Sequence, residues 1–352
     1  MTKKIYSLLA LLCLTVSSAW AQGPWTSGDC TVTLSGGEMT VSGSGAMHNY
    51  SGAGQVPWNS NKSVITSVVI GDGVTSIGSF AFSGCSNLST ISFGSGLTTI
   101  FSYAFQNCTN LTEVTLPASV TTIQQSFGGC TNLTTVTLNS NPAILGTAFP
   151  SGATVTMNLT AHEGETGEYW MTFYNKYQNF QVPATGTQIF KAALSGTKLE
   201  LTELTTDQTV TKDKPVILKS TASPIVMTLT STASSNDFSG NDLSGVSAAA
   251  GMTAADPSTT YVLNTGSQGV GFYKLASGKT IGLGKAYLTY SGGGVAAARG
   301  YFLFDETTGI EMPTVEGNGD AEAVVYDLQG RRVLNPTKGL YIVNGKKVFI
   351  NK

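Results

Sequence analysis

Apolar and polar residues recur with a fixed period between residues 63 and 138. An isoleucine opens three successive units every 23 residues, at Ile77, Ile100 and Ile123, and each unit then carries a phenylalanine, a cysteine, an Asn-Leu pair and two apolar residues separated by one polar residue. A unit this short cannot bury its own apolar face, so successive units stack and share one core. The pattern predicts a solenoid of short parallel strands.

Alternation within each unit indicates which side chains face the core. The inward residues of the strands are predicted to be the pairs Val68/Ile70, Ile91/Phe93, Val114/Leu116 and Val136/Leu138. Neighbouring strands would lie about 4.8 Å apart. A second apolar position should fill the opposite side of the core, at Phe82, Phe105 and Phe127.

Two further repeat positions are predicted to be structural ladders, at Cys85, Cys108 and Cys130 and at Asn87, Asn110 and Asn132. A buried free cysteine behaves as a small hydrophobe, whereas the asparagines should hydrogen-bond the turning backbone. Disulfides are an alternative that export would permit. Zinc binding is another, but no histidine accompanies the thiols and their spacing is not Cys-x-x-Cys.

The motif AF-x-x-C-x-N-L-x-x-[IV]-x-[FL], as in Ala81–Phe93 and Ala104–Leu116, resembles the BspA-type leucine-rich repeat. That family comprises surface and secreted proteins of the Bacteroides group. The resemblance covers residues 63–138 and implies a leucine-rich-repeat solenoid. It also implies adhesion to host proteins or other cells.

Both ends of the array need a cover against solvent. At the N-terminal end, residues 30–41 alternate around Gly36-Gly37, which predicts a β-hairpin. With Trp25 and Trp58 this hairpin forms the predicted cap, residues 22–62, in which His48 also packs. At the other end a degenerate fourth unit closes the repeats (63–160), and residues 161–183, with Trp170, Phe173 and Tyr174, are predicted to be the C-terminal cap and linker.

Short alternating segments separated by Gly, Ser and Asp turns follow in residues 184–305 and predict a β-sandwich-like domain. Within it, the small and polar stretch 231–258 is predicted to be a long mobile insertion. Residues 306–320 form a linker by composition, and residues 321–352 a small C-terminal β segment. The predicted fold class is therefore mostly β, with the solenoid and its N-terminal hairpin cap ahead of these two β regions.

The last strands, Val324–Val333 and Lys338–Lys352, resemble the tail of C-terminal sorting domains used for type IX secretion and surface attachment. The earlier strands of that family are not evident. A small β-hairpin domain that docks on the sandwich is the alternative interpretation.

Residues 1–21 have the pattern of a secretory signal peptide. Lys3 and Lys4 precede an apolar run, and Ala19-Trp20-Ala21 forms an A-x-A cleavage site. The alternative is a transmembrane anchor, but the apolar run is too short to span a bilayer. We therefore expect an extracellular or outer-surface location and no membrane span in the mature chain.

Composition narrows the class of protein further. Charged residues make up only 11% of the chain, against about 25% in an average globular protein. The polar character comes instead from Ser, Thr, Asn and 41 glycines, which suits turn-rich extracellular β-modules. A formal net charge of −2 offers no general attraction to nucleic acid.

Candidate catalytic and metal-binding groups do not form a set. Asp72 and Glu113 fall on different repeats and different faces, whereas acid–base catalysis needs two groups held together. The loop His162–Glu168 could offer an imidazole and carboxylates to a metal, but its two glycines favour a solvated turn. Ser291–Val295 is glycine-rich but lacks the Lys-Ser/Thr of a phosphate loop. We expect no enzymatic activity, no cofactor and no metal.

The sequence thus predicts a secreted or surface-displayed binding protein whose partner is a host or bacterial surface protein or glycoprotein. Contact is expected on the outward strand face, at Ser92, Glu113, Thr115 and Thr137. Phe101 and Tyr103 form a second candidate site, because they break the repeat consensus. The alternatives are a structural component of a surface assembly and, less favoured, a glycan-active enzyme.

Overall fold

The computed structural model describes residues 22–164, 167–195, 198–248, 250–254, 256–257, 259–266 and 269–291, and beyond them the strand segments 301–303, 309–311, 325–326, 332–333, 339–343 and 346–350. The predicted signal peptide and most of the predicted linker 306–320 lie outside these residues. The chain divides into two compact units, residues 1–312 and 313–352. The described residues are nearly all strand, turn and loop, and the predicted mostly-β fold class is confirmed.

The predicted N-terminal hairpin cap is confirmed. Strands β1 (Gln22–Ser27), β2 (Cys30–Ser35) and β3 (Glu38–Gly43) pair antiparallel, and β3 then pairs in parallel with β5 (Ser67–Ile70), the first repeat strand. Gly36 and Gly37 take φ values of 58° and 89° at the turn, which a two-residue hairpin requires. Trp58 is fully buried, and its Nε1 donates to Ala81 O at 2.9 Å. The short 3-10 helices η1 (Ala53–Gln55) and η2 (Asn59–Val64) flank it.

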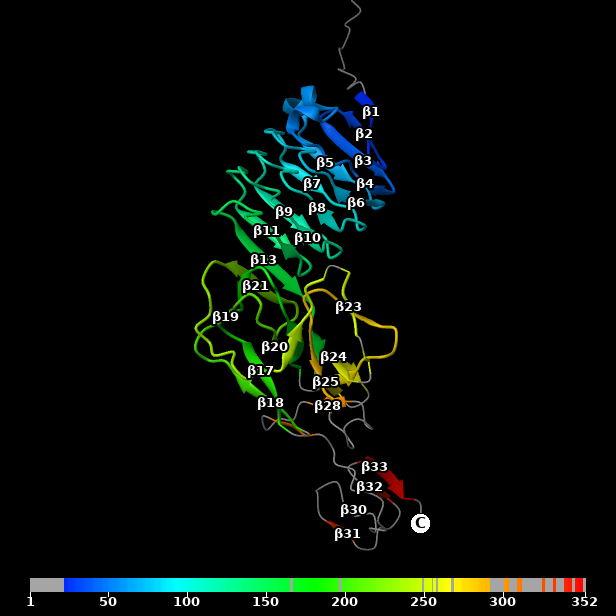
Figure 1. Ribbon diagram of the computed structural model, residues 1–352, viewed down its shortest axis with the longest axis vertical. Coiled ribbons are helices and arrows are strands. Elements are labelled where there is room, and N and C mark those ends of the chain that lie inside the picture. The colour runs from blue at the N-terminus through cyan, green and yellow to red at the C-terminus, as the bar shows by residue number, and fades with distance from the viewer. Residues whose placement is uncertain are drawn as a thin grey trace, which may run out of the picture. The chain divides into compact units, whose positions relative to one another are not determined.

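The repeats form the predicted solenoid, in which each unit supplies one strand to each of two series of parallel strands (Figure 1). One series contains β5, β7 (Thr90–Ser92), β9 (Glu113–Leu116), β11 (Thr135–Leu138) and β13 (Thr154–Leu159). The other contains β4 (Gly45–Ala46), β6 (Val74–Ile77), β8 (Thr99–Ile100), β10 (Thr122–Ile123) and β12 (Ala143–Ile144). The repeat isoleucines lie in register, Ile77 opposite Ile100, Ile100 opposite Ile123, and Ile123 opposite Ile144.

A phenylalanine stack runs through the solenoid core. Phe82, Phe105, Phe127 and Phe149 follow one another with ring centroids 5.2 to 5.5 Å apart and interplanar angles of 9° to 19°. The first three are fully buried, and Phe149 is 5% exposed. Because each repeat places the same residue at the same point of the turn, the rings stack at the spacing of the strands.

The inward strand residues are buried except on β7. Ile91 and Phe93 are only half-buried, although they pack against the core. In this series the ladder pairing stops at β7 and resumes at β9, so these neighbouring strands lie in different sheets. The hydrogen-bonded ladder of this strand series is therefore interrupted between the second and third repeats.

The four described cysteines are buried free thiols. The Cys108 thiol donates to Phe82 O at 3.3 Å and the Cys130 thiol to Phe105 O at 3.1 Å, so each sulfur contacts the carbonyl of the preceding repeat. The repeat asparagines Asn87, Asn110 and Asn132 are all exposed, and the Asn87 side chain makes the predicted hydrogen bond to the backbone. Asn87 Nδ2 donates to Ser63 O at 2.6 Å, and at Asn110 the backbone N–H donates to Ser86 O at 3.1 Å.

The stability of the array should depend on pH through Cys85. Burial raises the pKa of the Cys85 thiol from 9.0 to about 12, with the positive charge of Lys62 acting in the opposite direction. Above pH 9 the unfolded chain releases this proton while the folded chain retains it, so stability is lost as pH rises toward 12. The expected loss from Cys85 is about 1 kcal/mol between pH 9 and pH 10 and approaches about 1.4 kcal/mol per pH unit in the middle of that range. Urea unfolding at pH 9 and pH 10 measures it.

The matched comparison for this pH effect is the variant Cys85→Ala. Its free energy of unfolding should fall by about 1 kcal/mol less than that of the parent chain between pH 9 and pH 10, because the unfolded thiol is only half ionised at pH 9. An equal fall in both proteins would show that the Cys85 thiol does not retain its proton in the folded state.

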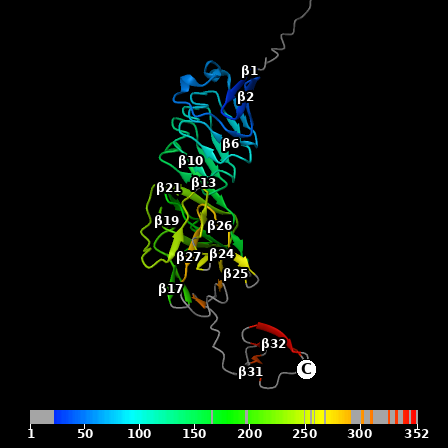
Figure 2. The same cartoon turned by 45° about the vertical axis from the view of Figure 1, so that its right-hand side comes forward.

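Three sheets follow one another from β9 onward in the first unit, and the first of them includes the last repeat strands (Figures 1 and 2). The bridging sheet has the order β9-β11-β13-β21-β16-β19 and includes β16 (Asn179–Gln181), β19 (Thr209–Val210) and β21 (Ile225–Thr230). The middle sheet has the order β14-β15-β20-β17-β18-β29, with β14 (His162–Glu163), β15 (Tyr169–Phe173), β17 (Thr187–Ser195), β18 (Lys198–Glu203), β20 (Val216–Ser220) and β29 (Gly309–Glu311). The distal sheet has the order β22-β27-β24-β25-β28, with β22 (Leu243–Gly245), β24 (Thr260–Gly266), β25 (Gly269–Lys274), β27 (Ala286–Thr289) and β28 (Tyr301–Leu303). A separate pair joins β23 (Met252–Thr253) to β26 (Thr280–Ile281).

Alternate residues of the middle sheet enter two different cores. Phe173, Val216 and Leu218 belong to the core that continues from the solenoid. Trp170 and Ile217 belong to a second core shared with the distal sheet. Since successive side chains of a strand point to opposite faces, the middle sheet is buried on both sides and joins the two cores.

The solenoid does not end at a separate cap. Strand β21 pairs antiparallel with β13, with Met227 opposite Met157, so the sheet of the repeats continues directly into the bridging sheet. The segment predicted to be the cap is divided, because β15 lies in the middle sheet and β16 in the bridging sheet. Its Phe173 and Phe180 pack in the core that continues from the solenoid.

The stretch predicted to be a mobile insertion is tied to the bridging sheet over its described first part. The Asp207 carboxylate accepts hydrogen bonds from the Ser234 hydroxyl at 2.8 Å and from the Ser235 N–H at 2.6 Å. Asn236 Nδ2 donates to Asp207 O at 2.9 Å, and β22 then joins the distal sheet. Because polar side chains form these contacts, the composition of the stretch did not indicate its attachment.

The second unit contains the predicted small C-terminal β segment. Strands β30 (Val325–Tyr326), β31 (Arg332–Val333), β32 (Gly339–Val343) and β33 (Lys346–Ile350) form an antiparallel sheet in the order β31-β30-β32-β33. The hairpin of β32 and β33 places Leu340 opposite Phe349.

Candidate functional site

The candidate site is the outward face of the bridging sheet. Burial of Val114 and Leu116 on β9 turns Glu113 and Thr115 outward, and both are exposed. Thr115 lies opposite Thr137 of β11. The structure therefore brings together three of the four residues predicted on this face.

A row of side chains in register crosses this face from the repeats into the following region. It contains Thr115, Thr137, Thr156, Thr228 and Gln181, on the adjacent strands β9, β11, β13, β21 and β16. We call these five residues the outer row. Their exposure ranges from half-buried to exposed.

Three members of the outer row were missed by sequence reasoning. The recurrence of Thr-x-Thr at residues 135–137 and 154–156 is a signal that could have indicated Thr156. No such signal exists for Thr228 or Gln181, because they reach this face through antiparallel pairing with a strand that is distant in sequence.

Ser92 lies beside the outer row without joining its ladder. It is exposed on β7, where it lies opposite Val69 of β5. The pairing interruption between β7 and β9 separates it from Thr115. Any partner that contacts both residues must cross this interruption.

The chemistry of the face is mainly that of neutral hydrogen bonding, with Val226 of β21 as an exposed apolar side chain. Hydroxyl groups and the Gln181 amide can both donate and accept. Among the outward residues of β9, β11, β13, β21 and β16, Glu113 is the one charged side chain. The face suits contact with a hydrogen-bonding surface and brings no second titratable group to Glu113.

Phe101 and Tyr103 lie in the turn after β8, away from the outer row. The Tyr103 ring stacks on Phe80 with centroids 4.9 Å apart and an interplanar angle of 27°, and its hydroxyl donates to Gln125 Oε1 at 3.4 Å. Phe80 and Tyr103 have φ values of 61° and 63°, a strained region for bulky residues. Phe101 is half-buried. The two predicted candidate sites are thus separate surfaces.

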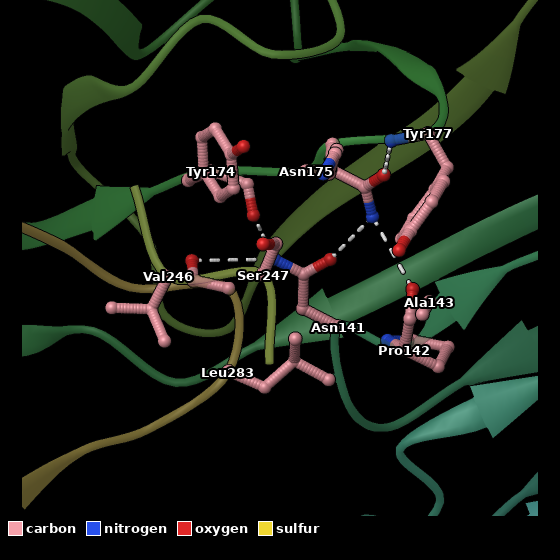
Figure 3. Close-up of a pocket in the computed structure, with 11 residues that line it drawn as sticks. Asn141, Pro142, Ala143, Tyr174, Asn175, Tyr177, Val246, Ser247 and Leu283 are labelled. Carbon is pink, nitrogen blue, oxygen red and sulfur yellow. Dashed lines mark hydrogen bonds between the residues drawn. The ribbon is translucent and has the colours of Figure 1, made fainter. Parts of the chain in front are cut away.

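A small cavity marks the junction between the loop after β11 and the following region (Figure 3). Asn175 Nδ2 donates to Asn141 Oδ1 at 2.8 Å, and Asn141 Nδ2 donates to Tyr174 O at 2.9 Å. Asn175 also accepts hydrogen bonds from the N–H groups of Tyr177 and Gln178. The cavity volume of about 10 Å³ has room for about one water. The hydrogen bonds around the cavity join the loop at Asn141 to the segment that begins at Tyr174.

The other titratable groups considered in the sequence have structural surroundings. The Asp72 carboxylate accepts from the Ser95 N–H at 2.7 Å and hydroxyl at 3.0 Å, and these hydrogen bonds lower its pKa. Burial, and then the charge of Lys285, lowers the pKa of His162. His48 makes an edge contact with Tyr50 at 4.9 Å in the cap. Within the described residues no three metal-ligating side chains gather in one place.

Comparison with protein families identifies the repeats. The model for the BspA type leucine rich repeat region, with six copies, matches residues 60–160 and 125–215. This region is similar to the BspA-type leucine-rich repeat. The match covers the three regular repeats, the degenerate fourth repeat and the strands β14 to β19 that follow it. Comparison with curated protein sequences gives no match.

Three solved structures are similar to parts of the chain. A leucine-rich repeat protein from Eubacterium ventriosum is 20% identical over 38% of this chain and 42% of its own, with a TM-score of 0.31. A leucine rich cell surface protein from Faecalibacterium prausnitzii is 21% identical over 39% and 51%, with a TM-score of 0.20. The T. pallidum leucine rich repeat protein is 20% identical over 31% and 74%, with a TM-score of 0.18. This chain therefore spans about half the length of the first two proteins or less.

No helix among the described residues is both long and apolar enough to cross a membrane.

Proposed function

We propose that the protein is a secreted or cell-surface, non-enzymatic binding protein that contacts a host or bacterial surface protein or glycoprotein through the outer row and Glu113. The observation that supports this proposal is the register of five outward side chains on adjacent strands of one sheet. Repeat arrays act by presenting such extended surfaces to a partner.

The physical character of the face also supports binding. Its strands belong to a sheet whose inner side is buried, so the backbone is already ordered before a partner arrives. Short threonine side chains lose little conformational freedom on contact, which limits the entropic cost of association. Because Glu113 is the one charged outward residue of these strands, the fit between this face and a partner must come from shape and hydrogen bonds.

Surface location rests on two sequence features. The N-terminal segment has the pattern of a secretory signal, and the C-terminal strands resemble a type IX sorting tail. BspA-type repeats are typical of cell-surface proteins, which agrees with export. We propose that the second unit serves this sorting.

The double variant Glu113→Lys/Thr115→Lys tests the proposed face. Two long cations on a neutral surface should clash with a partner selected for hydrogen bonding, and binding should weaken by at least about tenfold. Stability should hardly change, because both side chains are exposed. Binding of the chain 22–352 to immobilised matrix proteins and mucins measures the effect.

Glu163→Lys is the control, because Glu163 is exposed on β14, outside the bridging sheet. It changes the net charge in the same direction and should retain binding. Equal affinity of the double variant and the parent chain would remove this face from consideration. A concentration-dependent oligomer without any matrix or mucin binding would favour a structural role in a surface assembly.

A further inference from the structure

A second and larger cavity lies on the middle sheet, where β17 begins and β20 ends. Its volume is about 380 Å³, which falls in the range of about 300 to 1,000 Å³ typical of small-molecule sites. The residues that line it include Glu168, Gln188, Glu203, Gln208, Lys219 and Ser220. None of the outer-row residues lines it, so it is distinct from the proposed binding face.

Almost all residues that line this cavity are of polar types. It offers two carboxylates, one ammonium, two amides and three hydroxyls, and Ala184 is its one apolar side chain. Most ligand pockets are lined mainly by apolar side chains with a few polar groups. Here the polar groups and the methylene and methyl groups of the same side chains both line the cavity, which favours a ligand that carries hydrogen-bonding groups on a C–H framework.

Parts of the lining are held in place by the fold. The hydroxyls of Thr187 and Ser220 are buried and lie 3.2 Å apart, within hydrogen-bond distance. The Lys219 ammonium lies 4.9 Å from the centroid of the Trp170 ring, a cation–π contact that orients it. These groups therefore need little reorganisation to meet a ligand.

Gln208 supplies the observation that points to a ligand. Its backbone carbonyl is fixed by the Val182 N–H at 2.9 Å. Its side-chain Oε1 is buried, yet it accepts no hydrogen bond from any described residue. A buried acceptor without a partner costs about 1 to 3 kcal/mol, and a hydroxyl donated by a ligand would satisfy it.

We propose that this cavity binds a neutral saccharide unit. Sugar hydroxyls both donate and accept, and the lining offers acceptors at the carboxylates and amides together with donors at the amides, hydroxyls and Lys219. Two carboxylates against one ammonium disfavour an anionic sugar. The neutral amides and hydroxyls outnumber the charged groups, which favours a sugar over a zwitterionic amino acid. The proposal does not depend on the function of the outer row.

The variant Gln208→Leu tests this site in the full chain 22–352. Leucine removes the buried acceptor without leaving a polar group unpaired, so the fold should be as stable as the parent or more stable. Calorimetric titration with glucose, galactose and N-acetylglucosamine, one at a time, should show saturable binding of at least one. Affinity for that sugar should fall about tenfold in the variant, the effect of one lost hydrogen bond in a desolvated site.

Gln55→Leu is the matched control. Gln55 is exposed in η1 of the N-terminal cap and does not line the cavity, so this variant should leave sugar affinity unchanged. Equal sugar affinity in Gln208→Leu and the parent chain would overturn the proposed site. Absence of binding by all three sugars, with or without saturable binding of glycine, would overturn the proposed ligand class. Matrix-protein binding by Gln208→Leu should stay at the parent level, which separates this test from that of the outer row.

Discussion

A chain that ends at residue 183 is expected to lose cooperative unfolding of the repeat array. This truncation removes β21, which pairs with β13, and leaves the edge of β13 open. It also exposes Met157, Phe173 and Phe180, which lie in the shared core. Because a domain of this kind is stable by only about 5 to 15 kcal/mol, these losses should exceed what the remaining repeats supply. Thermal and urea unfolding of residues 22–183 measure the effect.

The control truncation ends at residue 312, at the boundary between the two compact units. The chain 22–312 keeps the bridging, middle and distal sheets and should unfold cooperatively, with a Tm close to that of residues 22–352. Cooperative unfolding of residues 22–183 at the same temperature would contradict the shared core. It would show that the repeats are a self-sufficient domain.

Replacement of Phe105 with alanine is expected to lower the free energy of unfolding by about 3 to 5 kcal/mol. The Phe105 ring is fully buried and stacks on both Phe82 and Phe127. Its neighbours belong to rigid turns of the solenoid, so the space left by the ring cannot readily collapse. Urea unfolding at constant m-value measures the change.

Phe101→Ala is the matched control, because it deletes the same ring from a half-buried position four residues away. Its cost should be about 1 kcal/mol, in proportion to the smaller apolar area that it buries. If both variants cost the same, the phenylalanine stack would not be a main source of the stability of the array.

The repeat region was the most predictable part of the molecule. Ile77, Ile100 and Ile123 lie in register because the same local sequence folds into the same turn at each repeat. The inward and outward sides of β9 and β11 followed from alternation with period two. The interruption between β7 and β9 was not predictable, since the residues on both strands fit the repeat equally well.

Of the candidate site, the sequence indicated the part that lies within the repeats. Glu113, Thr115 and Thr137 were placed on one face by alternation alone. Thr228 and Gln181 could not be placed, because alternation shows which residues of a strand share a face but not which strand is its neighbour. The polar cavity was equally hidden, since its lining comes from separate segments between residues 168 and 221.

The sequence by itself determined the solenoid, its core positions, the N-terminal hairpin and the β character of the rest, because periodicity and turn residues are local signals. Only the tertiary structure decided that β21 extends the solenoid sheet and that the middle sheet joins two cores. Pairing between distant strands depends on how all segments fill a shared core, and that packing has no counterpart in the local pattern of any one segment.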